Sequence, residues 1–209
     1  LTLPLPDPAV APTVTNGVHT GPWIVLIGPA GAGKSTLGAE IAGLTGREFV
    51  DIDLVGPPFY EEAGWPVARL IEESDSLGWV RTERAWEPAR SHAVVRVLPQ
   101  YPGGVVALGA GHTNYTQEHL FDQVRGALAG AQHVVWIEPV PDHEESLATL
   151  RARNIAEREL DYVLGGHDML AEWLTDPRAR TLATHVLHTR GRTPRECAEE
   201  LRRTLEQSG

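Results

Sequence analysis

The sequence predicts a three-layer α/β/α fold built around a parallel β-sheet, and three observations support this prediction. Short apolar runs, typical of strands buried on both faces, alternate with stretches of helical spacing. A glycine-rich loop joins the first such run to the first helical stretch. The last helix is marked by a capping box at residues 193–196, with proline at the first helical position. Strands that alternate with helices imply a parallel sheet covered on both faces.

The apolar runs predict five strands, and the residues that follow them are the candidates for a binding site. Ligands of open α/β sheets bind outside the carboxyl ends of the strands. The candidates are therefore Gly28 to Thr36, Asp51 and Asp53, Gly109 to Tyr115, and Glu138. The predicted strands cover residues 23–27, 48–52, 105–108, 133–137 and 185–188.

Helical spacing of apolar residues predicts the helices between these strands. Leu37, Ile41 and Leu44 recur at helical intervals directly after the glycine-rich loop, and Leu201 and Leu205 form the apolar stripe of the last helix. The other clear helical stretches are residues 82–98, 116–128 and 142 to about 158, in addition to 34–44.

Residues 28–35 read GPAGAGKS and match the phosphate-binding motif G-x-x-x-x-G-K-S. Lys34 is the only lysine among the 18 lysines and arginines of the chain, at the position where a compact ammonium on a flexible stem reaches between phosphate oxygens. Backbone N–H groups of such a loop cradle the β-phosphate, the lysine spans the β- and γ-phosphates, and the serine hydroxyl ligates Mg²⁺. The predicted nucleotide contacts are Gly28, Ala30, Gly31, Ala32, Gly33, Lys34, Ser35 and Thr36.

Composition limits the classes of partner and the domain organisation. The net charge of −10 argues against a nucleic-acid partner, and the absence of a long apolar run argues against a membrane span. The single Cys197 is consistent with a reducing cytoplasm. Residues 1–21 are rich in proline and have no positive charge, which predicts an extended arm rather than a signal peptide. Residues 22–209 are then one domain, as a monomer or a homodimer.

Four segments resemble the shikimate kinase group of P-loop small-molecule kinases, which is related to gluconate kinase, adenylylsulfate kinase and chloramphenicol phosphotransferase. They are GAGKSTLG at residues 31–38, FVDID at 49–53, LGAG at 108–111 and VLHTRGRTP at 186–194. The resemblance implies a five-stranded parallel sheet of order 2-3-1-4-5 and a lid over about residues 151–172. It also implies a kinase that uses ATP with Mg²⁺.

The resemblance also implies roles for individual residues near the acceptor. Asp51 matches the aspartate that supports Mg²⁺ through water, together with Ser35, and Asp53 matches the one that accepts a hydrogen bond from the acceptor hydroxyl. Arg84 matches an arginine that holds the acceptor carboxylate, and Arg81 is a competing choice. The loop after the third strand, which lies beside the acceptor in this family, here contains Gly109, Ala110, Gly111 and His112.

Arginines of the expected lid are candidates for stabilising the charge that spreads over the transferred phosphoryl group. Arg153 and Arg158 are the predicted catalytic pair, next to Lys34 and Asp53, and Arg151 is a predicted nucleotide contact. A solvated charged face of a long helix is the alternative interpretation of the same three arginines.

Departures from the family pattern concern the acceptor. The position of a second substrate-binding arginine falls on Thr175, so the resemblance implies an intact catalytic frame with a changed acceptor pocket. The hypothesis is therefore transfer of the γ-phosphate of ATP to a hydroxyl of a small metabolite or natural product, with antibiotic-modifying and biosynthetic kinases included. A cationic acceptor would have Asp53, Glu61, Glu62 and Glu87 as candidate contacts.

Three alternatives remain open. The chain could be a shikimate or gluconate kinase proper, or a regulatory nucleotide-binding ATPase without a small-molecule acceptor. A nucleoside monophosphate kinase is the third, although it needs several arginines around a second phosphate. The stretch from Asp51 to Trp65 contains no arginine, which disfavours this third alternative.

Overall fold

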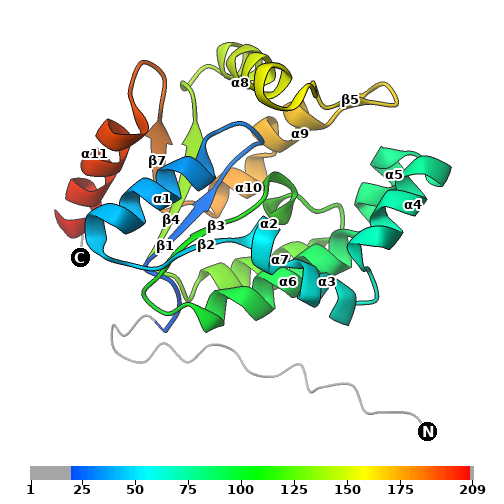
Figure 1. Cartoon of the computed structure of the whole chain (residues 1–209), viewed down its shortest axis with the longest axis horizontal. Coiled ribbons are helices and arrows are strands. Elements are labelled where there is room, and N and C mark those ends of the chain that lie inside the picture. Colours follow the sequence, from blue (N-terminus) through cyan, green and yellow to red (C-terminus); the bar gives the residue numbers. More distant parts are fainter. Residues whose placement is uncertain (1–19, 208–209) are drawn as a thin grey trace, which may run out of the picture.

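The computed structural model describes residues 20–207 and contains the predicted parallel sheet (Figure 1). Its strand order is β2-β3-β1-β4-β7, and every neighbouring pair is parallel. Since β7 is the fifth strand of this sheet along the chain, the predicted order 2-3-1-4-5 is confirmed. The strands are β1 (Ile24–Ile27), β2 (Phe49–Asp51), β3 (Val105–Ala107), β4 (His133–Glu138) and β7 (His185–His188). The arm predicted over residues 1–21 lies outside the described residues, apart from Thr20 and Gly21.

Two helical layers cover the sheet. Helices α1 (Lys34–Thr45) and α11 (Pro194–Gln207) pack against each other on one face, and α6 (Glu87–Val97) and α7 (Glu118–Leu128) pack together on the other (Figure 1). All residues of β1 and β4 are buried, as expected of central strands between two helical layers.

Further elements surround the carboxyl edge of the sheet. The remaining elements are α2 (Ile52–Val55), α3 (Pro57–Glu62), α4 (Val67–Leu77), α5 (Trp79–Ala85), η1 (Leu98–Gln100), η2 (Ala110–Thr113), α8 (His143–Arg158), β5 (Val163–Leu164), β6 (His167–Asp168), α9 (Met169–Thr175) and α10 (Pro177–Thr181). Of these, α4 and α5 form one projecting wall, and α8, the β5–β6 hairpin and α9 form another (Figure 1).

The prediction of one continuous helix over residues 82–98 is wrong. The segment forms two helices, α5 and α6, which meet at Trp86. Pro88 lies in the first turn of α6, where its missing N–H costs nothing, but the same ring would break the interior of a longer helix.

The second strand is shorter than predicted, because Ile52 already belongs to α2. The Asp51 carboxylate accepts a hydrogen bond from the backbone N–H of Asp53 and thereby caps this short helix. The cap turns the chain sharply at the end of β2, which brings Asp51 and Asp53 to the same edge of the sheet.

Within residues 20–207, no helix combines the length and the apolar character that crossing a membrane would require.

Candidate active site

The glycine-rich loop passes from β1 to the first turn of α1 and depends on backbone conformations that only glycine adopts readily. Gly31 and Gly33 have φ of 75° and 88°, in the left-handed region. A side chain at Gly31 would also approach the Asn154 amide to 2.6 Å. That amide donates a hydrogen bond to the carbonyl of Ala30 at 3.1 Å, so α8 holds the loop in place.

The Lys34 ammonium lies within this loop and is almost completely buried. Its Nζ donates hydrogen bonds to the carbonyl oxygens of Gly28 and Pro29, each at 2.8 Å. Burial lowers the pKa of Lys34 to about 8, Asp53 opposes this shift, and the positive charge of Arg158 adds to it. A buried cation inside a glycine-rich loop is well suited to bind a phosphate group.

Ser35 and Asp51 adjoin one another at the mouth of the loop. The Ser35 hydroxyl donates to the Asp51 carboxylate with an oxygen–oxygen distance of 2.5 Å. Hydroxyl and carboxylate oxygens are the hard ligands that Mg²⁺ prefers, and Mg²⁺ usually takes few protein ligands beside phosphate oxygens and water. The donor set fits this cation, and residues 20–207 contain no group of three or more acidic, histidine or cysteine side chains that would suit a dedicated protein cage.

Asp53 lies further into the same site, against the loop that follows β3. Burial raises the pKa of its carboxyl group, and the neighbouring Asp51 raises it further. Gly109 passes so close that a Cβ atom there would lie 2.5 Å from Asp53 Oδ1 and 2.7 Å from His112 Nδ1. Glycine at this position therefore allows the acid and the imidazole to approach the same backbone. A carboxylate with a raised pKa is a stronger proton acceptor than an ordinary aspartate.

His112 is buried on the floor of the site. Its Nε2 atom is hydrogen bonded to the Tyr60 hydroxyl at 2.8 Å, and only 3% of the residue is exposed. Burial lowers the pKa of His112 to about 3, and the positive charge of Arg90 acts in the same direction. The imidazole is therefore neutral across the physiological range and offers one N–H donor and one acceptor.

We expect His112 to make the stability of the protein depend on pH. Its folded pKa of about 3 lies below the ordinary value of 6.5, so between these values the unfolded chain binds a proton and the folded chain does not. The stabilisation is fully present above pH 6.5 and is lost as the pH falls. Between pH 7 and pH 5, the unfolding free energy of the wild type should fall by about 2 kcal/mol more than that of His112→Gln. Urea unfolding at both values measures this difference, and equal losses in the two proteins would contradict it.

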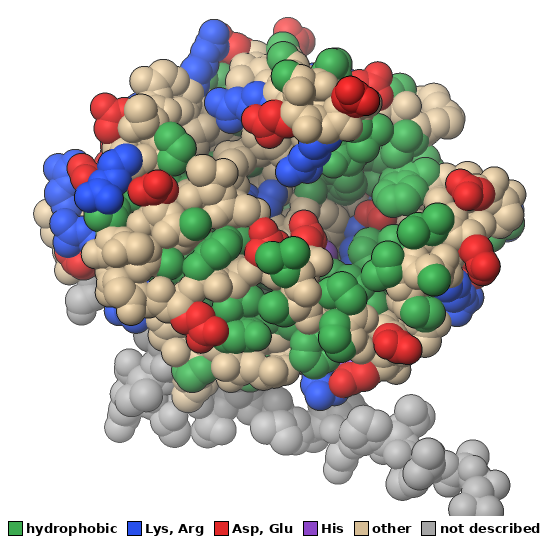
Figure 2. Space-filling model, viewed as in Figure 1, with side chains coloured by type: hydrophobic (Ala, Val, Ile, Leu, Met, Phe, Trp, Pro, Cys, Tyr) green, Lys and Arg blue, Asp and Glu red, His purple; other side chains and the backbone are tan. Residues whose placement is uncertain are grey.

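These groups line one cavity of about 670 Å³. Figure 2 shows the hollow between the α8–α9 wall and the α4–α5 wall, with hydrophobic side chains along one side and charged side chains at the floor. Most of the predicted site residues are brought together here. Those that line the cavity are Ala30, Gly31, Ala32, Gly33, Lys34, Ser35, Thr36, Asp51, Asp53, Gly109, Ala110, Gly111, His112, Arg153 and Arg158.

Two of the predicted lid arginines approach the glycine-rich loop. Arg153 donates to the carbonyl of Gly31 at 3.4 Å, and Arg158 donates to the Tyr162 hydroxyl at 3.2 Å. Arg158 is also close enough to Lys34 and Asp53 to lower the pKa of both groups. The two guanidinium groups thus border the space in which a bound phosphate chain would end.

Three of the predicted contacts, Gly28, Arg84 and Arg151, do not line the cavity. Arg84 donates both to Glu172 at 2.5 Å and to Asn114 at 3.1 Å, which occupies its guanidinium. Arg151 is paired with Asp168 and also donates to the carbonyl of Asp161, so it stabilises the turn around the β5–β6 hairpin. Both guanidinium groups are bound by partners distant in sequence. The helical spacing of residues does not predict such contacts.

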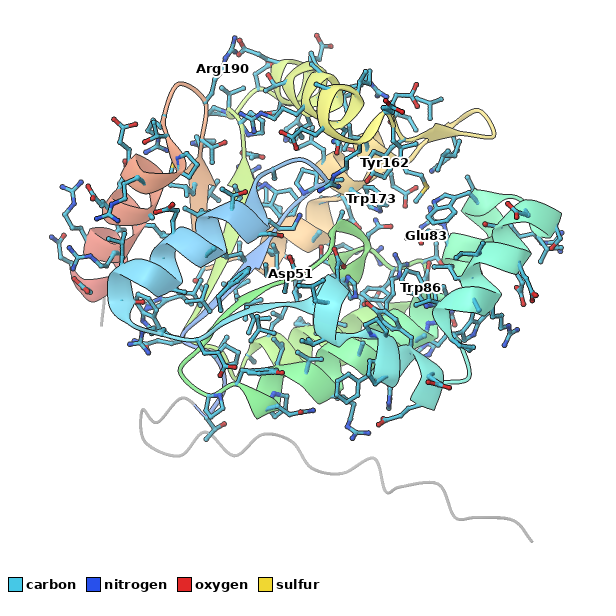
Figure 3. The ribbon with its side chains drawn as sticks, viewed as in Figure 1. Asp51, Glu83, Trp86, Tyr162, Trp173 and Arg190 are labelled. Carbon is cyan, nitrogen blue, oxygen red and sulfur yellow. The ribbon has the colours of Figure 1, made fainter. Side chains whose placement is uncertain are left out.

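Sequence reasoning missed the aromatic part of the cavity. Trp79, Trp86, Tyr162 and Trp173 all line it, from α5, the α5–α6 junction, the segment before β5, and α9. Figure 3 shows Trp86 on one side of this space, and Tyr162 and Trp173 on the other. The only signal in the sequence was the presence of six tryptophans, of which Trp79 precedes the stretch predicted as one helix and Trp86 lies within it.

A buried ion pair was also missed. Glu83 and Arg90 line the cavity from opposite sides of the helix break, and their side chains form a salt bridge with only 4% and 1% of their surfaces exposed. The far end of the cavity is lined by Thr189, Arg192 and Cys197, from the β7–α11 loop and the start of α11. Burial raises the pKa of the Cys197 thiol, which keeps it protonated.

The chain is similar to known proteins in sequence and in structure. A family model described as "Shikimate kinase" matches residues 30–206. A shikimate kinase from Acinetobacter baylyi is 27% identical over 190 residues, covering 91% of this chain and 95% of that protein. One from Salinispora arenicola is 32% identical over 182 residues, covering 86% and 95%. The solved shikimate kinase from Acinetobacter baumannii in complex with shikimate superposes with a TM-score of 0.56 at 22% identity, covering 90% of this chain and 94% of that chain.

Proposed function

The chain belongs to the shikimate kinase family, and from this premise we propose that it transfers the γ-phosphoryl group of ATP to a hydroxyl group of a small molecule other than shikimate. The family match makes the chain a kinase with an alcohol group as acceptor, in a family that uses ATP with Mg²⁺. The identity of the acceptor and the roles of individual residues are the parts that we propose.

The observation that carries the proposal is that one cavity holds the complete set of groups for phosphoryl transfer. The glycine-rich loop with Lys34 lies at its centre, and Asp53 faces the same space with a raised pKa. One end of the cavity adjoins Thr189 and Arg192, where we place the nucleoside. The other end adjoins α5 and α9, where we place the acceptor.

The proposed reaction is an in-line displacement at the γ-phosphorus. The acceptor oxygen forms the new P–O bond while the bond from the γ-phosphorus to the bridging oxygen of ADP breaks. Asp53 orients the attacking hydroxyl and takes up its proton. Lys34, together with Arg153 and Arg158, stabilises the negative charge that develops on the phosphoryl oxygens.

Ser35 and Asp51 are the residues that would hold Mg²⁺, Ser35 directly and Asp51 through water. When bound, this ion neutralises charge on the β- and γ-phosphate oxygens. The short contact between the Ser35 hydroxyl and the Asp51 carboxylate supports this assignment, because it already gathers two hard oxygen donors at the mouth of the loop.

We further propose that residues 22–209 form one kinase domain in which about residues 151–172 act as the lid. The support is that α8 and the segment after it carry Arg153, Arg158 and Tyr162 to the cavity. Tyr162 has a φ of 61°, a conformation that costs free energy for a residue with a side chain and recurs where a segment is held for function.

An acceptor other than shikimate is favoured by the state of the arginines near the acceptor end. Arg84 is bound to Glu172, and Thr175 stands where the resemblance places a second arginine. Arg178 and Arg180, the nearest arginines in sequence, are paired with Glu118 and Glu138. The arrangement lacks the pair of free guanidinium groups that would hold a small carboxylate.

The test is a turnover assay with Mg-ATP and a panel of hydroxylated small molecules, which includes shikimate, gluconate and nucleoside 5′-monophosphates. We expect one ADP for each phosphorylated acceptor, with a neutral acceptor favoured over shikimate. Release of ADP without any phosphorylated product would instead support the regulatory ATPase. Preferred turnover of shikimate, gluconate or a monophosphate would replace the proposal by the corresponding kinase.

A further inference from the structure

The acceptor end of the cavity, between α5 and α9, is built largely of aromatic rings. Trp79 and Trp86 come from the α5 side, and Trp173 and Tyr162 come from the lid side. The Tyr162 and Trp173 rings meet edge to face at 5.2 Å, and Trp86 meets Tyr60 in the same way at 4.8 Å. These ring contacts hold the indoles of Trp86 and Trp173 in fixed orientations. Figure 3 shows Trp86 on one side of the space, and Tyr162 and Trp173 on the other.

Several nitrogen donors of the side chains at this end are fully buried. Within the described part of the chain, the indole N–H groups of Trp79, Trp86 and Trp173 have no hydrogen-bond partner, and neither does the Nε atom of Arg90. These nitrogen atoms are also buried away from the cavity surface, so a bound molecule would meet the indoles through their rings rather than through these N–H groups. The ring faces would at the same time gain contact with an apolar or aromatic surface.

The charges at this end cancel one another. Arg90 is the arginine that lines it beside the tryptophans, and its guanidinium is already paired with Glu83 in a buried salt bridge. An acceptor carboxylate would have to share Arg90 with Glu83 and would remain partly uncompensated in a buried site, which is costly.

Binding of a positively charged acceptor is also disfavoured at this end. Of the candidate acidic contacts expected for it, Glu61, Glu62 and Glu87 do not line the cavity. Glu62 is paired with Arg96 at the surface, and Glu87 accepts hydrogen bonds from Thr116. Asp53 is the remaining candidate, and the proposed reaction already uses its carboxylate to bind the hydroxyl group.

We propose that the acceptor is an uncharged molecule that combines its hydroxyl group with a ring large enough to stack on the indoles of Trp79, Trp86 and Trp173. This inference rests on the proposed function and gives the substrate class of the same site. It separates the chain from kinases whose acceptor is a small carboxylate, because recognition here is by contact with aromatic rings rather than by free arginines.

Matched glycosides test the inference by calorimetry, with Mg²⁺ and a non-hydrolysable ATP analogue at saturation. Phenyl β-D-glucopyranoside and phenyl β-D-galactopyranoside carry a neutral ring, and the two methyl glycosides lack it. Phenyl β-D-glucuronide keeps the ring but adds a carboxylate, and shikimate has a carboxylate on a small ring. We expect the phenyl glycosides to bind about tenfold or more tightly than the methyl glycosides, and more tightly than the glucuronide and shikimate. Equal binding within the pairs, including no binding by either member, would overturn the inference, as would tighter binding of shikimate or the glucuronide.

Variants connect the preference to the indoles. Trp173→Leu and Trp79→Leu should each reduce the preference for phenyl over methyl glycosides by about fivefold or more, without weakening binding of the nucleotide analogue. Trp65→Leu is the matched control, since Trp65 lies outside the cavity lining. Its ring centroid is 3.9 Å from the guanidinium carbon of Arg69. A preference that survives both cavity substitutions would contradict the assignment, and Trp79→Phe gives an intermediate test if a leucine variant does not fold.

The nucleotide titration distinguishes failure of the proposed kinase function from failure of the proposed acceptor class. If the wild-type protein gives no heat with the Mg-nucleotide analogue, the proposed kinase function fails and the acceptor class fails with it. If the nucleotide binds and the phenyl glycosides show no advantage, only the acceptor class is wrong.

Discussion

Replacing Lys34 with methionine is expected to lower kcat for acceptor phosphorylation by about 10²–10⁴-fold, as loss of a cation that stabilises a transition state does. The ammonium is the only lysine charge in the chain, and it is held at the centre of the loop by the carbonyls of Gly28 and Pro29. Methionine keeps the length of the side chain but removes the charge and these hydrogen bonds. The measurement is kcat from steady-state ADP release with the best acceptor.

The matched control for this variant is Arg96→Met. Arg96 is an exposed cation on α6 that pairs with Glu62 and does not line the cavity, so its replacement should leave kcat unchanged. Full turnover by Lys34→Met would refute the assigned role of the ammonium.

Replacing Asp53 with asparagine is expected to lower kcat by about 10²–10⁴-fold while leaving the affinity for the nucleotide nearly unchanged. The carboxylate is the proposed acceptor of the hydroxyl proton, and its raised pKa suits that task. Asparagine has almost the same shape, so the approach of Gly109 and His112 to this side chain should survive. The measurements are kcat by ADP release and the nucleotide Kd by calorimetry.

Asp122→Asn is the control for this change. Asp122 forms a salt bridge with Arg125 on the surface of α7, and the loss of such a pair has little effect on stability or activity. Losses of similar size in kcat and in nucleotide affinity for Asp53→Asn would indicate a distorted site rather than a lost proton acceptor.

The elements near the glycine-rich loop could be predicted because their signals are local. Residues 24–27 are an uninterrupted apolar run and the loop motif fixes the turn after it, so strand, loop and helix followed directly. The carboxyl ends of neighbouring parallel strands then had to bring Asp53 and Gly109 to the same edge of the sheet. The strand order itself came from the family resemblance, because residue patterns alone do not state which strands are neighbours.

The acceptor side could not be predicted because it depends on contacts between distant segments. Arg84 and Glu172 are 88 positions apart, so nothing in the sequence near Arg84 showed that its charge would be paired with Glu172. Glu83 and Arg90 lie seven positions apart on either side of the break at Trp86, which is beyond the spacing of three or four residues at which a helical pattern predicts an ion pair. The hairpin of β5 and β6 has two residues in each strand, too few to show an alternating pattern.

The salt bridge between Arg84 and Glu172 fastens α5 to α9, the two sides between which an acceptor has to pass. Only about a quarter of each side chain is exposed to solvent, and the guanidinium donates to both carboxylate oxygens at 2.5 Å. The resting spacing of the two helices therefore depends on an ion pair between segments far apart in the sequence, so the width of the space between them is set by a contact that neither segment specifies alone.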